Sequence, residues 1–418
     1  MARAPKSPTV ASQKKVTPEN LANLGAARLA EILAEFAQTR PDLKRRLRME
    51  LAAEQGADHL VGEIDKRLAS LETSRSKVSW RKRATFVADL EGLRQLIAER
   101  LTGLDPVLAL DRLWTFMDLT RRLGTRVKDR DGSLGAVFAR AANDIGALLA
   151  ERRDAGAVGA LVEAITRDPG AWRDWLRPVL AGLPEPVVAS ALAQAQLKPE
   201  GPVGWGAIVR LLADAAGDVD AFAATFSGDD LRAPQAAAQV ALRLMAAGRV
   251  EAAGDLLKAS APGRAATAPD FGWETAWIEY LDRSGAAQDA QAVRWASFER
   301  TLSVERARAF VGGLSGFDDV EADQKAREHA ARHADFEPAL RFLMDWPALP
   351  EAAAMINARG DEIDVAADDA ELWAGRLRTR HPAAAHALLR KAAAAAFKRR
   401  EFAACDRLTL EADTITLD

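Results

Sequence analysis

The stretch LMAAGRVEAAGDLL, Leu244 to Leu257, contains two alanine-rich apolar segments separated by a short polar turn around Gly248. Two further stretches have the same order, LDRSGAAQDAQAV from Leu281 and FKRREFAACDRL from Phe397. Ala and Leu have high helix propensity, and a short connection makes consecutive helices antiparallel neighbours. Each of the three stretches therefore predicts a helical hairpin.

The spacing of the turns indicates a repeat. Gly248 and Gly285 lie 37 residues apart, which is within the range of helical-hairpin units such as tetratricopeptide or HEAT repeats. From Gly285 to Arg400 the distance is 115 residues, close to three more such intervals. The sequence thus predicts an all-α protein, with an N-terminal helical domain followed by an α-solenoid of antiparallel helical hairpins. A compact helical bundle is the alternative.

The N-terminal part carries amphipathic segments with clear start signals. Thr17 and Pro18 form an N-cap and first-turn proline, and leucines then recur at three- and four-residue steps as far as Phe36, which predicts one helix. Asp105 and Pro106 repeat this signal. Further helices are expected from Pro41, over about 57–71, after Trp80 and over 134–153.

Charge is distributed unevenly along the chain. Residues 1–150 hold 26 Lys and Arg against 19 Asp and Glu, whereas the remainder holds 31 against 41. We therefore predict a flexible basic tail at 1–16, a basic helical domain at 17–153 and an acidic, alanine-rich hairpin array at 154–418. Such asymmetry suits an anionic partner or head-to-tail association of copies.

Composition excludes several classes of protein. The one cysteine, Cys405, rules out an intramolecular disulfide and a cysteine-only zinc site, which fits a reducing compartment such as the cytoplasm. Apolar runs stay well below the roughly 20 residues that span a bilayer, and the N-terminus has no apolar secretion segment. The acidic run from Asp361 to Glu371 is expected to form a solvated face.

Several long runs carry a resemblance to a known family. LGAARLAEILAEFAQTRPDLKRRLRMELA from Leu24, SRSKVSWRKR from Ser74 and DPVLALDRLWTFMDLTRRL from Asp105 resemble a bacterial all-helical family known only as a domain of unknown function. HPAAAHALLRKAAAAAFKRREFAACDRL from His381 is similar to the closing hairpin of that family. The resemblance spans most of the chain and implies a helical fold, with no activity or catalytic residue.

A basic segment around one tryptophan is the sharpest local feature. Five cations surround Trp80 within ten residues, namely Arg75, Lys77, Arg81, Lys82 and Arg83. Lys and Arg neutralise phosphates and an indole stacks on an unpaired base, so the segment is a candidate site for nucleic acid or another polyanion. The structural alternative is a buried Trp80 at the start of a helix, with the cations solvated or paired.

Two other groups are weaker candidates. Trp273, Trp277 and Tyr280 recur at helical spacing, which fits either a protein-binding stripe or the core. His329 and His333 lie four residues apart, a spacing that can place two imidazoles on one metal ion, but their run EHAARH differs from HExxH and solvated or capping roles are expected. We predict no cofactor.

The functional prediction follows from the fold more than from any motif. We expect a non-enzymatic scaffold or adaptor that binds a protein partner on a helical-repeat surface, because stacked hairpins expose long continuous faces. The alternative is polyanion binding around Trp80. A third hypothesis is an enzyme whose site residues converge only in the fold.

Overall fold

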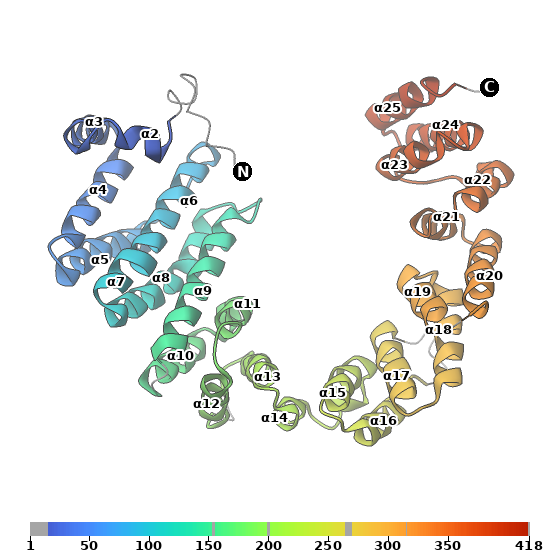
Figure 1. Cartoon of the computed structure of the whole chain (residues 1–418), viewed down its shortest axis with the longest axis horizontal. Coiled ribbons are helices and arrows are strands. Elements are labelled where there is room, and N and C mark those ends of the chain that lie inside the picture. The colour runs from blue at the N-terminus through green and yellow to red at the C-terminus, as the bar shows by residue number, and fades with distance from the viewer. Residues whose placement is uncertain (1–15, 153–154, 199–200, 264–269, 315, 417–418) are drawn as a thin grey trace, which may run out of the picture. The chain divides into compact units, whose positions relative to one another are not determined.

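The computed structural model describes residues 16–152, 155–198, 201–263, 270–314 and 316–416. Helices and their connections make up these ranges, and they contain no β-strand (Figure 1). The predicted all-α fold is therefore confirmed. By packing, the chain divides into two compact units, residues 1–225 and 226–418. The predicted flexible tail at 1–16 lies outside the described residues, apart from Val16.

The first unit consists of helices that pack mainly on near neighbours in the chain, such as α5 on α8 and α9 on α11. A π-helical turn at Leu96–Leu101 continues α6. The helices are α2 (Pro18–Ala22), α3 (Ala26–Thr39), α4 (Pro41–Ala53), α5 (Ala57–Thr73), α6 (Trp80–Gln95), α7 (Thr102–Leu104), α8 (Pro106–Arg126), α9 (Ser133–Arg152), α10 (Ala155–Arg167), α11 (Pro169–Leu180), α12 (Glu185–Gln196), α13 (Trp205–Ala216) and α14 (Val219–Ala223).

Both predicted helix starts are confirmed. The Thr17 hydroxyl accepts a hydrogen bond from the Asn20 amide at 3.3 Å. The Asp105 carboxylate accepts from the amides of Val107 and Leu108 at 2.8 and 3.0 Å. These side chains satisfy amides that have no partner inside the helix, and the prolines that follow need none.

The single helix expected between Pro18 and Phe36 is wrong, because the chain breaks it into α2 and α3. Gly25 has a φ of 79°, a left-handed conformation that no α-helix contains. Leucine spacing continues across the break, so periodicity alone does not reveal it.

The predicted boundary near Asp154 falls at residues 153–154, outside the described residues. Packing continues on both sides of that position, because α9 before it lies against α11 after it. Compact units are separated instead between Thr225 and Phe226. The division at 153 follows charge, and as a domain boundary it stays a prediction.

The second unit is an array of hairpins in which each helix packs on its neighbours along the chain (Figure 1). This arrangement is an α-solenoid. A short 3₁₀ turn, Asp230–Arg232, precedes α15, and another, Gly360–Glu362, lies between α22 and α23. The helices are α15 (Pro234–Ala246), α16 (Val250–Ala259), α17 (Phe271–Arg283), α18 (Ala287–Thr301), α19 (Val304–Gly312), α20 (Asp318–Arg332), α21 (Phe336–Asp345), α22 (Leu349–Ala358), α23 (Ala367–Leu377), α24 (Pro382–Lys398) and α25 (Phe402–Asp413).

The three predicted hairpins share one turn geometry. Gly248, Gly285 and Arg400 all have positive φ, at 76°, 83° and 63°. The next amide bonds to the carbonyl five residues earlier, as in Arg249 to Leu244 at 2.8 Å and Glu401 to Ala396 at 2.9 Å. This is the bonding of the Schellman motif, which satisfies carbonyls at the end of a helix. The same bond joins Ala348 to Leu343 between α21 and α22, a hairpin that the sequence did not reveal.

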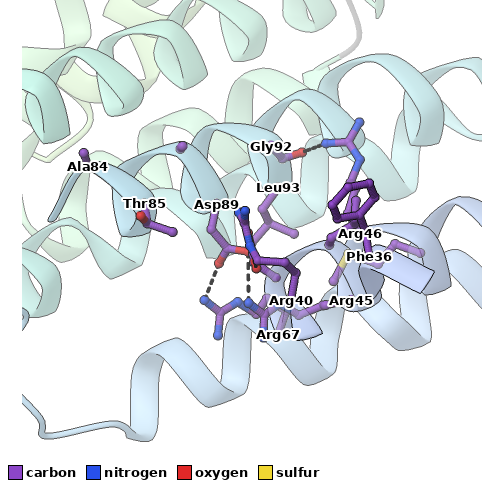
Figure 2. A pocket seen from close by; sticks show the side chains of 14 residues that line it. Phe36, Arg40, Arg45, Arg46, Arg67, Ala84, Thr85, Asp89, Gly92 and Leu93 are labelled. Carbon is purple, nitrogen blue, oxygen red and sulfur yellow. Dashed lines mark hydrogen bonds and ion pairs between the residues drawn. The ribbon is translucent and has the colours of Figure 1, made fainter. Parts of the chain in front are cut away.

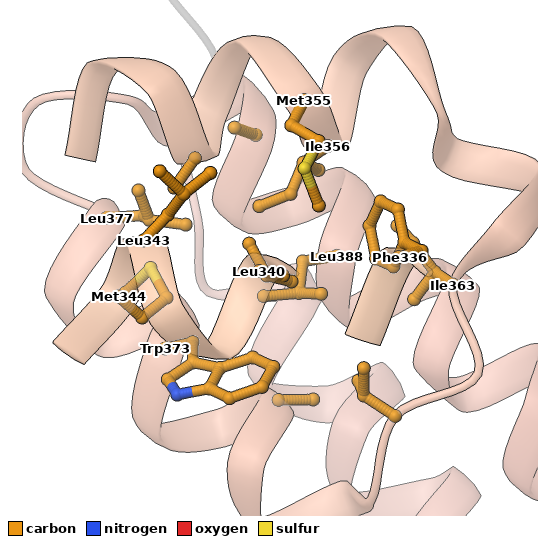
Figure 3. Close-up of a cluster of buried hydrophobic side chains, with 14 of the residues drawn as sticks. Phe336, Leu340, Leu343, Met344, Met355, Ile356, Ile363, Trp373, Leu377 and Leu388 are labelled. Carbon is orange, nitrogen blue, oxygen red and sulfur yellow. The ribbon is translucent and has the colours of Figure 1, made fainter. Parts of the chain in front are cut away.

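A continuous core runs through the last hairpins (Figure 3). Phe336 and Leu340 of α21 lie in one buried cluster with Trp373 of α23 and Leu388 of α24. Small residues on α24, namely Ala392, Ala393 and Ala396, are also buried there. Their size allows α24 to lie close to its neighbours, which is how alanine-rich helices form a core.

The acidic run near residue 361 is a largely solvated face, as expected, because the side chains of Asp361, Asp364 and Asp368 are 97%, 72% and 91% exposed. Asp361 pairs with Lys391 at 2.6 Å, and Asp364 pairs with Arg399. Asp368 pairs with Arg407 at 3.0 Å. These ion pairs connect separate elements of the last hairpins, but they are exposed to solvent and therefore contribute little to stability. In the described ranges, no helix has the length and apolarity to cross a membrane.

Candidate functional site

The basic segment begins in a fixed connection between α5 and α6 and ends in the first turn of α6. Arg126 of α8 holds it by donating hydrogen bonds to the carbonyls of Leu71 and Ser76 at 2.8 and 3.0 Å and to the Ser74 hydroxyl at 3.0 Å. The Val78 amide donates to the Arg126 carbonyl at 3.0 Å. The connection therefore has a defined path although it is not helical.

Trp80 opens α6 and is 79% exposed, so the alternative of a buried Trp80 does not hold. The Arg81 guanidinium lies 5.3 Å from the centre of its ring. Arg75, Lys77, Arg81 and Lys82 are exposed and form no ion pair within the described residues. Arg83 differs, since it donates to Asp131 at 2.7 Å and to the Lys128 carbonyl at 3.0 Å. It fixes the start of α6.

Beside this segment a cleft opens between α4, α5 and α6, with the end of α3 at its edge (Figure 2). It consists of two adjoining cavities of about 560 and 620 Å³, which share Arg45, Arg67 and Asp89. We call it the basic cleft. Its charged lining residues are Arg40, Asp42, Arg45, Arg46, Arg67, Lys77, Lys82, Asp89 and Arg126.

One carboxylate serves two arginines in the centre of the cleft. Asp89 accepts from Arg45 at 3.0 Å and from Arg67 at 2.5 Å, as the dashed lines in Figure 2 show. Burial lowers the pKa of Arg67, the Asp89 charge opposes this, and the Arg45 charge adds to it. The pKa of Arg126 is also lowered, by burial first and then by Arg122 and Arg67. Cations therefore repel one another here, and a further anion would relieve that repulsion.

At the rim, Arg40 pairs with Asp42 at 2.7 Å, and this hydrogen bond lowers the pKa of Asp42 to about 2. Arg46 donates to Glu50 at 2.9 Å and to the Gly92 carbonyl at 2.6 Å. The lining as a whole has seven cations and two carboxylates. The net charge of the lining is strongly positive, even when Glu50, which binds Arg46 but does not line the cleft, is counted.

Apolar side chains line the same cleft. Phe36 is 59% exposed at the end of α3, and Leu43, Met49 and Leu93 continue the apolar lining on α4 and α6. No sequence pattern predicts this site, because Phe36, Arg45, Arg67 and Asp89 come from four separate helices. The only local sign was the run of cations from Arg40 to Arg48.

The aromatic stripe on α17 lies largely inside the fold. Trp273 is buried and its indole nitrogen donates to the Ser260 hydroxyl at 3.2 Å. Trp277 stacks on Trp273 with ring centres 5.6 Å apart, and Tyr280 lies 5.1 Å from Trp277. Trp277 and Tyr280 are half-buried, so any protein-binding role falls to these two and stays a prediction.

His329 and His333 have structural partners. The His329 ring lies against Trp295 and Phe298, and its Nε2 is 3.2 Å from the Glu299 carbonyl. His333 Nδ1 accepts from the Asp335 amide at 3.1 Å. Among the residues that the structure places, no group of three or more His, Cys, Asp or Glu side chains has a geometry that could hold a metal ion.

The described fold is thus an all-helical hairpin protein with a basic cleft in its first unit. The chain belongs to a family of unknown function (DUF6880), whose model matches residues 11–186 and 205–404. This agrees with the resemblance seen in the sequence.

Other known proteins give little information beyond the family assignment. No curated protein matches the chain. Among solved structures, it is similar to a circular tandem repeat protein with novel repeat topology and enhanced subunit contact surfaces, at 14% identity and a TM-score of 0.19, over 92% of this chain and 96% of that chain. The solenoid assignment rests on the packing of the helices themselves.

Proposed function

We propose that the protein is a non-enzymatic scaffold that binds a protein partner, and that the partner docks in the basic cleft. One observation carries the proposal: the cleft combines an exposed aromatic, Phe36, with several arginines around an apolar lining. Protein interfaces are enriched in aromatic residues and arginine, and their strongest contacts lie where such side chains lose water together. Both lining carboxylates, Asp42 and Asp89, are paired with arginines, which suits binding more than acid–base chemistry. A cytoplasmic location is part of the proposal.

The test is affinity capture with the full chain from a lysate of the source cells at moderate salt, followed by reconstitution. Each captured protein is purified and its affinity for the full chain is measured in solution. The expected result is at least one protein that binds saturably. If no captured protein binds again in purified form, the scaffold function is refuted.

A second function is favoured by the exposure of Trp80 and by the four cations near it that form no ion pair with any described residue. These side chains suit a single-stranded nucleic acid, which offers phosphates to Lys and Arg and bases to an indole. The affinity for a labelled single-stranded oligonucleotide should then fall steeply with salt.

The variants for this second function follow from the contacts. Reversing Arg81 and Lys82 to Glu should abolish oligonucleotide binding, whereas Arg83 should be left intact because it fixes α6 through Asp131. Trp80→Ala should weaken binding by about 1–3 kcal/mol for one stacked base. Binding that withstands these changes would exclude this site.

A further inference from the structure

We propose that the basic cleft recognises an acidic, amphipathic segment of another protein, with carboxylates against its arginines and one apolar side chain against Phe36. This inference rests on the proposed scaffold function and names the chemistry of the partner. Three features of the cleft lead to it: shared carboxylates, unpaired cations and an exposed apolar wall.

The first feature is the shortage of carboxylates. Asp89 is shared by Arg45 and Arg67, so each guanidinium keeps donors that Asp89 does not use. A guanidinium has five N–H donors, and carboxylates are its preferred bidentate partners. A second carboxylate from a partner segment completes this pairing.

The second feature is a group of cations on the α5–α6 connection, the first turn of α6 and the end of α8. Lys77 and Lys82 line the cleft and have no ion pair among the described residues. Arg126 donates to two carbonyls and a hydroxyl, which leave its charge uncompensated. Several acidic residues of one segment can therefore bind along the cleft, and their charges also speed the encounter.

The third feature separates a protein segment from a nucleic acid. Phe36 is exposed beside Leu43 and Met49, and every residue of α3 is exposed or half-buried. Leu33, one turn before Phe36, extends the apolar surface of α3. A base of a nucleic acid stacks on the aromatic ring of Phe36 only, whereas an amphipathic helix presents apolar residues at three- and four-residue steps, which also contact the aliphatic side chains beside it.

The experiment is a selection of random 16-residue peptides, displayed on phage, against the full chain. The enriched peptides should combine Asp or Glu with Leu, Phe or Trp. A synthetic copy, labelled with fluorescein, then gives an affinity by anisotropy. Phe36→Ala should weaken it by about tenfold or more, as for an aromatic anchor. Lys77→Glu with Lys82→Glu should weaken it by a similar factor and flatten its salt dependence.

Matched controls keep the result independent of folding. Phe397→Ala removes a phenylalanine of nearly the same exposure, 61%, in the second unit, and Lys398→Glu reverses an exposed lysine there. Both should leave the peptide affinity unchanged. Circular dichroism of the cleft variants should match the original chain, because Phe36, Lys77 and Lys82 are exposed.

Three outcomes overturn the inference: no enrichment, enrichment of peptides without acidic residues, or affinity that the cleft variants do not change. The inference is also overturned, in favour of a polyanion, if a single-stranded oligonucleotide at equal concentration displaces the peptide and the Phe36→Ala variant still binds both ligands. If a captured protein binds the Phe36→Ala variant as tightly as the original chain, the inference about the cleft is wrong, but the scaffold function is still supported.

Discussion

Gly146 of α9 lies against the backbone of α11, and the absence of a side chain makes that approach feasible. A Cβ atom at this position would lie 2.6 Å from the Val179 carbonyl oxygen and 3.3 Å from its carbonyl carbon. The Val179 backbone cannot rotate away from the added methyl group, as a flexible side chain could. We expect Gly146→Ala to lower the free energy of unfolding by about 1–3 kcal/mol, as overpacking does, despite the roughly 1 kcal/mol that Ala gains in helix propensity.

Gly62 of α5 provides the control for this prediction. No described atom beyond its own helix and chain neighbours lies within 4 Å of a Cβ built there. Gly62→Ala should therefore raise the free energy of unfolding by up to about 1 kcal/mol. Urea denaturation of both variants measures the two effects, and equal shifts in one direction would show that α9 and α11 do not approach as described.

The pair of Arg40 and Asp42 at the rim of the cleft is testable by titration. Its hydrogen bond holds the pKa of Asp42 at about 2. The lowered pKa means that this pairing favours the folded state above the ordinary aspartate pKa and ceases to do so as pH falls through about 2. In Arg40→Ala, the pKa of Asp42 should return toward about 3.9. Carbon NMR of the labelled carboxylate would follow it, and an unchanged midpoint would contradict the pairing.

At the scale of elements, the hairpin turns have one residue each in the left-handed region. Glycine adopts this conformation without cost, whereas another residue loses about 1–2 kcal/mol. Arg400, with a φ of 63°, stands where Gly248 and Gly285 stand in their hairpins. Arg400→Gly should stabilise the protein by about 0.5–1 kcal/mol, since glycine's greater unfolded-state entropy offsets part of the gain.

Gly285→Ala is the reciprocal change. Its Cβ would meet nothing within 4 Å among the described atoms, so only the backbone conformation penalises it. A loss of about 1 kcal/mol is expected. If Arg400→Gly and Gly285→Ala shift the midpoint of thermal unfolding in the same direction, the two turns do not share one geometry.

Asp89 connects three helices, because it lies on α6 and binds Arg45 of α4 and Arg67 of α5. Asp89→Asn removes the charge and keeps the shape, leaving two partly buried guanidiniums unpaired. The free energy of unfolding should fall by about 2 kcal/mol. An acidic peptide that binds in the cleft should bind the folded variant several-fold more tightly, as anisotropy would show. Weaker binding would mean that Asp89 orients the arginines for the partner.

The same elements show what sequence can predict. Hairpin turns and helix starts depend on residues within one stretch, such as Gly248 or Thr17 with Pro18, and these predictions are confirmed. The basic cleft depends on side chains that are distant in sequence, and Arg45, Arg67 and Asp89 carry no local pattern that separates them from other surface charges. Trp80 was identified from sequence, but its exposure depends on packing, which a cluster of cations does not determine.

At the scale of the molecule, charge and packing divide the chain differently. The basic residues concentrate before residue 150, whereas the compact units meet between 225 and 226. Charge depends on the side chains at the surface, and packing depends on which helices share a core. A boundary taken from composition therefore describes the surface, and the candidate cleft lies within the basic part.

The hairpin array also predicts how the second unit responds to damage. Because each hairpin packs on its neighbours, a defect should spread over adjacent helices and fade along the array. Trp373 is 2% exposed in the core of α21–α24, and Trp373→Ala should cost about 3–5 kcal/mol locally. Hydrogen exchange measured by mass spectrometry should accelerate most in α21–α25 and least in α15–α17. Ile278 and Leu281 of α17 form a separate buried cluster with Ala290 of α18. Trp80→Ala is the control, because it removes an exposed indole and should change hydrogen exchange little. If Trp373→Ala instead accelerates exchange uniformly across the second unit, the second unit unfolds as one block.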